Sequence, residues 1–165
     1  MKRAVSHSIQ LLSHGWKQSS AASRSFLVSS MDIVSPKRRS EIMRRVPSKN
    51  TSAELVVRKI TYGLGFRYRL HRKDLPGKPD LVFPGRKKVI FVHGCFWHAH
   101  KNCCRARIPV ANRAYWEAKI SRNVSRDSNQ IALLQNDGWN VLVIWECELR
   151  DAATLEAKLR EFLNG

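Results

Sequence analysis

One group of residues limits how this chain can fold more than any other. The four cysteines fall in two places: Cys95, Cys103 and Cys104 share one short segment with His100, and Cys147 follows much later. Thiolates together with one imidazole suit a tetrahedral Zn²⁺ ion, and a structural zinc site uses four protein ligands. A shared zinc ion would therefore fix the Cys95 segment against the residues around Cys147.

Only one of the two adjacent cysteines is needed to complete such a site. Adjacent side chains rarely point at one ion, so we assign Cys103 as the ligand and Cys104 as a spare thiol. In the alternative interpretation Cys147 is a small buried hydrophobic residue and the other candidates are incidental. No secretory signal segment precedes the cysteines, which favours a reducing compartment, where clustered Cys and His indicate a metal rather than disulfides.

The charge of the chain indicates a polyanionic partner. Thirty Lys and Arg residues against thirteen Asp and Glu give a net charge of +17. Nucleic acid is the first candidate, because each Lys–phosphate contact releases counterions. No apolar run approaches the roughly 20 residues that span a bilayer, and no basic amphipathic helix of the membrane-binding kind is present.

A chain of 165 residues has the length of one domain. Residues 1–30 contain four basic residues, no acidic ones and many serines, and superficially look like an organellar transit peptide. We interpret them as a disordered N-terminal extension with at most a short helix at 9–12. Residues 31–165 form the predicted folded domain.

Turn and capping signals predict the elements of this domain. Ser35-Pro36 begins a basic helix that runs through Arg45. A capping box over 51–54 begins a helix that ends at Gly63, with Leu55, Val56 and Ile60 on its buried face. The remaining pattern predicts strands over 66–70, 80–83 and 89–92, a hairpin turn at 84–85, a helix over 112–134, a buried strand over 141–145 and a helix from Asp151 to Phe162. This order indicates an α/β fold, with a mixed β-sheet flanked by helices.

Two carboxylates are candidates for catalysis. Asp80 begins a predicted strand, where a carboxylate projects rigidly and can bind Mg²⁺, although it could also be a turn residue. Asp127 falls on the apolar stripe of the long helix, where a carboxylate is costly unless it is paired or functional. We place that stripe at Trp116, Ile120, Val124, Ile131 and Leu134.

Two histidines and a glutamate complete the candidates. His98 could take a proton from the attacking water, or it could bind zinc in place of His100. His93 is a weaker candidate, for a contact in the second shell or to a metal-bound water. Glu54 belongs to the capping box, and it could also orient Asp127 or a metal-bound water.

Four segments carry a resemblance to a known family. PGKPDLVF, VIFVHGCFWHAH, NRAYWEAKISRNVSRD and GWNVLVIWECELR resemble the very short patch repair (Vsr) endonucleases, over a stretch from Met31 to about Arg150. The resemblance implies a variant of the restriction-endonuclease fold with catalytic Mg²⁺ and structural Zn²⁺. It also implies nicking of one DNA strand 5′ of the thymine at T:G mismatches left by deamination of 5-methylcytosine. We then expect a monomer in the bacterial cytoplasm, with other repair proteins as candidate partners.

The resemblance gives each candidate a role. Asp80 and the backbone carbonyl of Val92 would bind Mg²⁺, and some members have Thr at position 92. The catalytic residues would be Asp80, His98 as general base, Asp127 as its support and Glu54 as the N-terminal acidic member. The zinc ligands would be Cys95, His100, Cys103 and Cys147, with a spacing after His100 one residue longer than in some members, so Cys104 stays an alternative. Met43, Phe96 and Trp97 would wedge between bases, unless they simply pack in the core.

Two other functions compete with this one. The first is a restriction-type or structure-specific nuclease of the same fold that cuts a different target. The second is a zinc-bearing DNA-binding module without catalysis. The combination of Asp80, His98 and Asp127 favours an enzyme, because binding alone requires no inward-facing acid.

Overall fold

The computed structural model describes Ser35, Arg38, Glu41 and residues 49–165. Residues 1–30, Met43 and most of the helix predicted from Ser35 to Arg45 lie outside the described residues. The backbone N–H of Arg38 donates to Ser35 Oγ at 3.3 Å, which is the contact expected of an N-cap serine.

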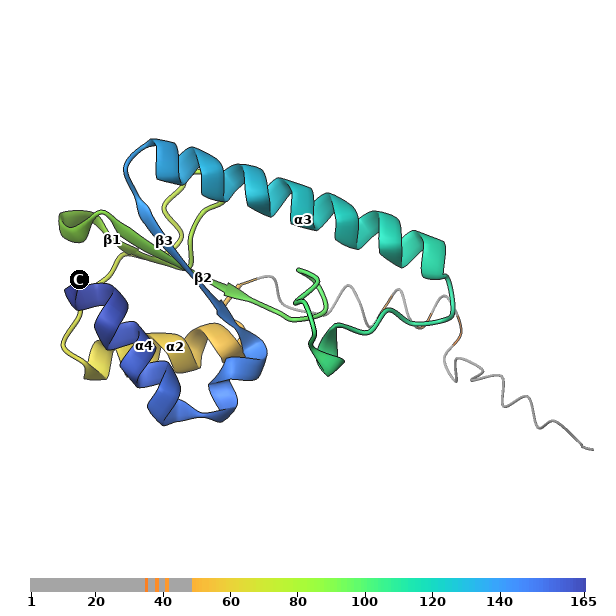
Figure 1. Cartoon of the computed structure of the whole chain (residues 1–165), viewed down its shortest axis with the longest axis horizontal. Helices are drawn as coiled ribbons and strands as arrows, with labels where there is room; N and C mark the ends of the chain where they lie inside the picture. Colours follow the sequence, from red (N-terminus) through yellow and green to blue (C-terminus); the bar gives the residue numbers. More distant parts are fainter. Residues whose placement is uncertain (1–34, 36–37, 39–40, 42–48) are drawn as a thin grey trace, which may run out of the picture.

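A three-stranded mixed sheet forms the centre of the molecule (Figure 1). β1 (Leu81–Phe83) pairs with β2 (Lys88–His93) in antiparallel orientation, and β2 pairs with β3 (Asn140–Trp145) in parallel orientation. The parallel register sets His93 opposite Trp145, at the end of both strands. The mixed α/β architecture predicted from the sequence is therefore confirmed.

Helices cover both faces of this sheet. Strand residues alternate between the faces: Leu81, Phe83 and Ile90 pack on one face with α2 (Ser52–Gly63) and α4 (Ala152–Asn164). Val82, Val89 and Phe91 pack on the other face, with Leu134 of α3 (Arg113–Asn136). Figure 1 shows the long α3 on one side of the sheet and the α2–α4 pair on the other. Both cores depend on β2, the central strand.

The predicted helix ends are confirmed at two N-termini. Thr51 and Glu54 form the capping box of α2, and the Asp151 side chain accepts from the backbone N–H of Thr154 at 3.1 Å to cap α4. These contacts satisfy N–H groups that have no partner inside the helix. The capping box matters for the site, because it orients Glu54.

Three predictions about strands and turns were wrong in detail. The strand expected over 66–70 is reduced to a single bridge, in which Arg69 and Val82 exchange two backbone hydrogen bonds. The hairpin predicted at 84–85 is present, because β1 and β2 pair in antiparallel orientation, but its turn is longer and forms a 3₁₀ turn, Pro84–Arg86, closed by Lys87 with φ of 50°. β3 is at an edge of the sheet in the described part of the chain, and only Ile144 of its residues is fully buried.

The predicted buried face of α2 was also wrong. Leu55 and Val56 are 52% and 40% exposed, whereas the buried residues are Glu54, Val57, Arg58 and Thr61. The spacing of these four follows one helical face. An apolar-only pattern misses this face because two of its members are charged and bonded to each other.

Among the described residues, no helix is both long enough and apolar enough to cross a membrane.

Candidate active site and metal cluster

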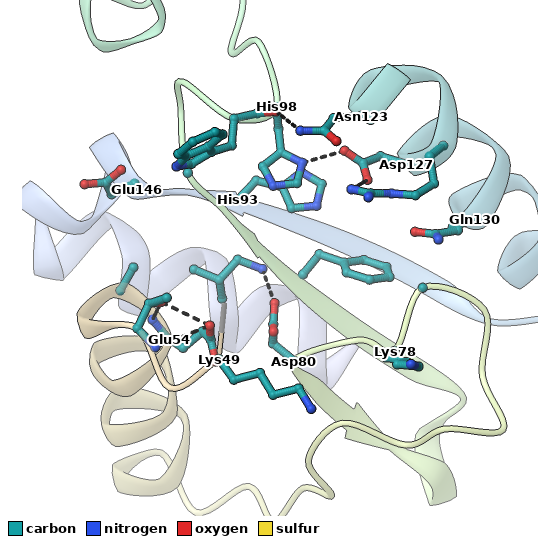
Figure 2. Close-up of a pocket in the computed structure, with 18 of the residues that line it drawn as sticks. Lys49, Glu54, Lys78, Asp80, His93, His98, Asn123, Asp127, Gln130 and Glu146 are labelled. Atoms are coloured by element: carbon teal, nitrogen blue, oxygen red, sulfur yellow. Dashed lines mark hydrogen bonds and ion pairs between the residues drawn. The ribbon is translucent and has the colours of Figure 1, made fainter. Parts of the chain in front are cut away.

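A cleft of about 900 Å³ opens between the start of α2, the end of β2 and the inner face of α3 (Figure 2). Asp80 and Glu54 lie on one side of it, and His98 and Asp127 lie on the other. The cleft therefore brings together the catalytic candidates that the sequence scatters over 74 positions, from 54 to 127.

Asp80 is held by the neighbouring strand. Its Oδ2 accepts the backbone N–H of Val92 at 2.7 Å, which leaves Oδ1 without a protein hydrogen bond in the described structure. Burial raises the pKa of Asp80 to about 6, and the charge of Glu54 adds to this, while the Val92 hydrogen bond and Arg58 oppose it. A buried carboxylate with a raised pKa gains strongly from a nearby cation. The backbone of Val92 lies beside Asp80.

His98 and Asp127 form a base–carboxylate pair. His98 Nδ1 lies 2.5 Å from Asp127 Oδ2, and Arg126 donates to the other carboxylate oxygen at 3.1 Å. Because Asp127 only accepts when ionised, the proton sits on Nδ1 and the second ring nitrogen, Nε2, is left as the basic atom.

His93 packs against the His98 ring of this pair. Its ring stacks on that of His98, with centroids 3.9 Å apart and planes 10° apart. Burial, and then the neighbouring His98, lower the pKa of His93 to about 4, so it is neutral at pH 7. His93, His98 and Asp127 also offer three ligand atoms within 4.8 Å of one another. Lone pairs lie in the plane of an imidazole, so those of two stacked rings run side by side instead of converging on one ion. The arrangement suits a positioned base better than a metal.

The inner face of α3 explains one further correction. Val124, which we placed on the buried stripe, is 38% exposed. The face that points inward instead carries Asn123 and Asp127, one turn apart, and Asn123 donates to the carbonyl oxygen of Trp97 at 3.0 Å. Beside the cleft the inward face of α3 is polar, so a prediction based on apolar residues selected Val124 in place of Asn123.

Glu54 does not contact Asp127. Its Oε1 accepts from Thr51, its Oε2 accepts from the backbone N–H of Asn50 at 3.0 Å, and Arg58 donates to Oε2 at 2.7 Å. Figure 2 shows Glu54 near Asp80, across the cleft from Asp127. The hypothesis that Glu54 orients Asp127 was therefore wrong, and its position relates it to Asp80.

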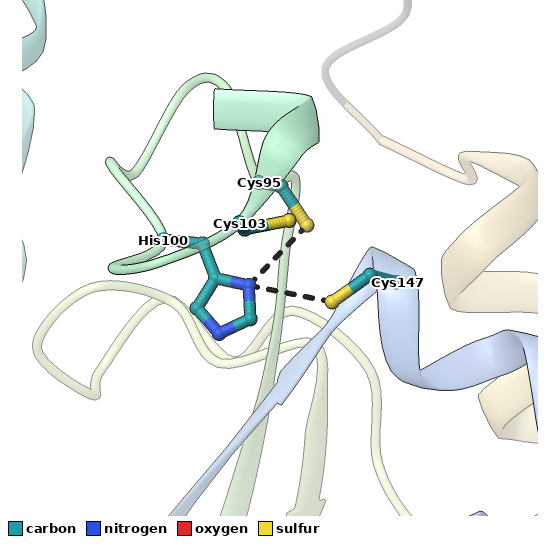
Figure 3. Close-up of side chains that lie close together, drawn as sticks. All are labelled: Cys95, His100, Cys103 and Cys147. Carbon is teal, nitrogen blue, oxygen red and sulfur yellow. Dashed lines mark hydrogen bonds between the residues drawn. The ribbon is translucent and has the colours of Figure 1, made fainter. Parts of the chain in front are cut away.

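A separate cluster joins the loop after β2 to the residue that follows β3 by two positions (Figure 3). Its ligand atoms all lie within 4.8 Å of one another, and they belong to Cys95, His100, Cys103 and Cys147. His100 Nδ1 is 3.6 Å from the sulfur of Cys95 and 3.3 Å from that of Cys147. Cys104 is exposed and is not part of the cluster. Three sulfurs and one nitrogen with this proximity could hold a metal ion.

The thiols of this cluster differ in their surroundings. Burial raises the pKa of Cys95 to about 12, whereas a hydrogen bond from the backbone of Arg105 lowers that of Cys103. A buried thiol of this kind becomes a thiolate only when a cation replaces its proton. Three thiols and one imidazole are a donor set that suits a soft metal ion.

Ring stacking separates the two histidines of the loop. His98 stacks on His93 at the end of β2, and His100 stacks on Trp145 at the end of β3, with centroids 4.2 Å apart. His93 and Trp145 are partners in the parallel register and their rings contact each other, with centroids 5.5 Å apart, so each loop histidine stacks on a different ring of this pair. His98 is thereby directed to the cleft and His100 to the cluster.

An aromatic group borders the cleft. Phe96 and Trp97 are half-buried and pack edge-to-face on each other and on Trp116, and Lys119 lies 5.3 Å over the Trp97 ring. Lys119, Asn123, Arg58 and His71 were missed from the sequence. The first two share the helical spacing of Trp116 and Asp127, which could have revealed them.

Comparison with known proteins agrees with this geometry. The family model of the DNA mismatch endonuclease Vsr matches residues 31–105, a range that includes Asp80, His98 and three residues of the cluster. The type II nicking enzyme V.XorIIP of Xanthomonas oryzae pv. oryzae is 50% identical over 133 residues, which cover 81% of this chain and 97% of that enzyme. The chain belongs to the Vsr family of DNA endonucleases.

Other Vsr relatives extend the similarity. The DNA mismatch endonuclease Vsr of Escherichia coli is 40% identical over 140 residues, covering 81% of this chain and 88% of that protein. The type II nicking enzyme V.NmeAIP of Neisseria meningitidis is 40% identical over 133 residues, covering 81% and 94%. The expected Vsr resemblance is thus confirmed across most of the chain.

Proposed function

We propose that this protein is a DNA mismatch endonuclease that nicks one strand 5′ of the thymine at T:G mismatches, acting on bacterial DNA in the cytoplasm. The observation that carries the proposal is the His98–Asp127 pair facing Asp80 across one cleft. Support also comes from the relative in E. coli named a mismatch endonuclease. The three-stranded mixed sheet between helices is compatible with the restriction-endonuclease-like fold that we infer.

Asp80 would bind Mg²⁺ together with the backbone carbonyl of Val92. Mg²⁺ prefers hard oxygen ligands and retains several waters, and Asp80 offers a carboxylate oxygen not occupied by a protein hydrogen bond. When bound, the ion supplies Lewis-acid stabilisation of the phosphate and a more acidic water. Glu54, the N-terminal acidic member, adds negative charge on the same side.

His98 would act as the general base. Asp127 holds the proton on Nδ1, so Nε2 can accept a proton from the attacking water. The neutral His93 ring beneath it fixes the plane of His98 without adding positive charge. Asp127 then stabilises the imidazolium that forms, as an orienting carboxylate does.

The cluster of Cys95, His100, Cys103 and Cys147 would hold a structural Zn²⁺ ion. Four protein ligands leave no position for substrate, so this ion would stabilise the fold and take no part in the reaction. The position of Cys103 within the cluster, and of Cys104 outside it, supports our choice of ligand.

Phe96 and Trp97, together with Met43, would wedge between bases beside the mismatch. Phe96 and Trp97 are half-buried and Trp97 lines the cleft, so their rings lie beside the proposed reaction site. Apolar side chains can unstack a base step, and stacking on aromatic rings contributes about 1–3 kcal/mol per base.

A sequence-dependent nicking enzyme of the same family is the second candidate, because several relatives are named type II nicking enzymes. An end-labelled duplex containing one T:G mismatch, compared with its homoduplex in Mg²⁺, separates the two. We expect one nick 5′ of the thymine in the mismatched duplex only. Equal nicking of both duplexes would favour the second candidate.

Asp80→Asn provides the matched test of catalysis. The variant keeps the size of the side chain but loses the charge that would hold Mg²⁺, so nicking should fall to background while duplex affinity is retained. Undiminished nicking by Asp80→Asn, with its nick at the same bond, would contradict the proposed active site.

A further inference from the structure

Arg58 is a buried cation beneath the cleft that the proposed reaction does not use. It lies on the inner face of α2 and is 7% exposed. Its guanidinium has three side-chain neighbours: Nη2 donates to Glu54 Oε2 at 2.7 Å, Nη1 donates to Asn50 Oδ1 at 2.7 Å, and Nη2 lies 3.1 Å from His71 Nε2.

These contacts join the N-terminal end of α2 to the connection that follows the helix. Asn50 precedes α2, Glu54 belongs to its first turn, and His71 lies in the connection that leads toward Asp80. Glu54 and His71 both line the cleft, and so do the neighbours of Asn50, Lys49 and Thr51. One guanidinium therefore fixes the wall of the cleft on its Asp80 side.

The chemistry of the contacts requires an arginine. A guanidinium is planar and only donates hydrogen bonds, so His71 Nε2 is the acceptor in its contact with Arg58. A lysine ammonium is a single point, and it cannot reach Glu54, Asn50 and His71 in one plane. His71 itself has a left-handed backbone with φ of 45°, which the surrounding contacts must hold in place.

Stability alone does not account for this arrangement. Buried ion pairs are often replaceable by apolar side chains with no loss of stability. In addition, Arg58 Nε is buried without a hydrogen-bond partner in the described structure. A costly group with one unsatisfied donor indicates a role in shaping the site.

We propose that Arg58 is a positioning residue of the nicking site, which fixes Glu54 and the two connections at Asn50 and His71 in the geometry that Asp80 requires. The inference rests on the proposed function, because it assigns Asp80 to cation binding.

The test compares two variants with one control. Arg58→Lys keeps the charge but loses the planar contacts. The paired variant Glu54→Gln/Arg58→Gln removes both charges, so no buried carboxylate is left unpaired and the fold is retained. Lys59→Gln removes one exposed charge from the same helix and serves as the control. Thermal unfolding and zinc content establish that each variant is folded.

Two readouts follow the role of Arg58 in the full-length protein. The first is steady-state nicking of the T:G duplex in Mg²⁺, where we expect kcat to fall about 10²-fold with KM unchanged, since a shift of about 1 Å at a catalytic group has this effect. The second is Mg²⁺ affinity without DNA, measured by calorimetry, which should weaken about 10-fold or more. Lys59→Gln should match the wild type in both.

The outcomes separate this inference from the proposed function. If the folded paired variant nicks and binds Mg²⁺ like the wild type, Arg58 is merely structural and the inference is wrong. If the wild type does not nick the T:G duplex but Mg²⁺ affinity still falls in both Arg58 variants, the proposed function fails and the positioning role stands.

Discussion

The cluster and the cleft both lie where β2 and β3 end, yet the cluster is closed and the cleft is open. Cys95 follows the end of β2 by two residues, and Cys147 follows the end of β3 by two residues. The cluster gathers four soft ligand atoms within 4.8 Å. The cleft is open, with a volume of about 900 Å³, and Asp80 offers it one carboxylate oxygen free of protein hydrogen bonds.

This difference in the number of protein ligands shows how the same end of the sheet can support two proposed metal sites. A site with four protein ligands has no place for substrate and contributes to folding, whereas a site with few protein ligands leaves positions for water and phosphate. Changes in the cluster should therefore alter stability first, and changes at the catalytic side chains of the cleft should alter the rate first.

The largest expected effect concerns the cluster. Cys95→Ser and Cys147→Ser should each lose the metal and unfold at far lower temperature, because structural zinc contributes about 10–16 kcal/mol of apparent binding free energy in small zinc domains. Metal content by mass spectrometry and melting curves check this result. Cys104→Ser is the control and should behave as the wild type. A Cys104→Ser protein without metal, beside a Cys103→Ser protein that keeps it, would reverse our ligand choice.

The two histidines of the loop provide the next test. His98→Ala should keep its metal and lose nicking by about 10²–10⁴-fold, the range of general-base contributions. His100→Ala should lose the metal and much of its stability. Zinc content and nicking rate, measured side by side, decide the matter. The assignment of His98 to the cleft and of His100 to the cluster is wrong if His98→Ala releases the metal and His100→Ala stays active.

A smaller loss is expected for the carboxylate behind the base. Asp127→Asn no longer imposes the Nδ1–H form of His98, so nicking should fall about 10–100-fold, as outer-shell partners typically require. Melting temperature and metal content should not change, since Asp127 belongs to the cleft only. An Asp127→Asn protein with wild-type kcat would remove Asp127 from the proposed mechanism.

The smallest effect comes from the shape of the cleft wall. Gly77 has φ of +74°, and a Cβ there would lie 2.8 Å from Gln130 Oε1 and 3.1 Å from Phe91 Cζ. Gly77→Ala should cost about 1–2 kcal/mol from the left-handed backbone alone, or about 2–8 °C in Tm, with metal retained and a modest loss of nicking. Gly85→Ala, where a Cβ meets open space, is the control. Equal melting temperatures for the two variants would contradict the assigned strain.

Much of the fold could be predicted from the sequence because its local signals agree with one another. The capping box at Thr51, the cap at Asp151 and the apolar runs of β1 and β2 all appear where expected. The pattern failed where the site replaces apolar residues by polar ones. Arg58 and Glu54 satisfy each other on the buried face of α2, and Asn123 takes the place we gave to Val124.

The candidate site was predictable in its members but not in its arrangement. Asp127 was found because a carboxylate on an inward helical face requires a partner, and that partner is His98. The relation of Glu54 to Asp80 depends on how α2 packs against the start of β1, which no local spacing encodes. The contact of Arg58 with His71 escaped notice for the same reason, since only the folded chain brings that connection against α2.

The distribution of the cluster over the chain also has a consequence during synthesis. Three of its four residues lie at 95–103, and the fourth is Cys147. At about 5–20 residues per second, a ribosome needs roughly 2–9 s to add the intervening segment. Until then β2 lacks its parallel neighbour β3, and the loop that carries His98 has no distant anchor. A nascent chain therefore cannot assemble the four residues of the cluster until Cys147 has been made.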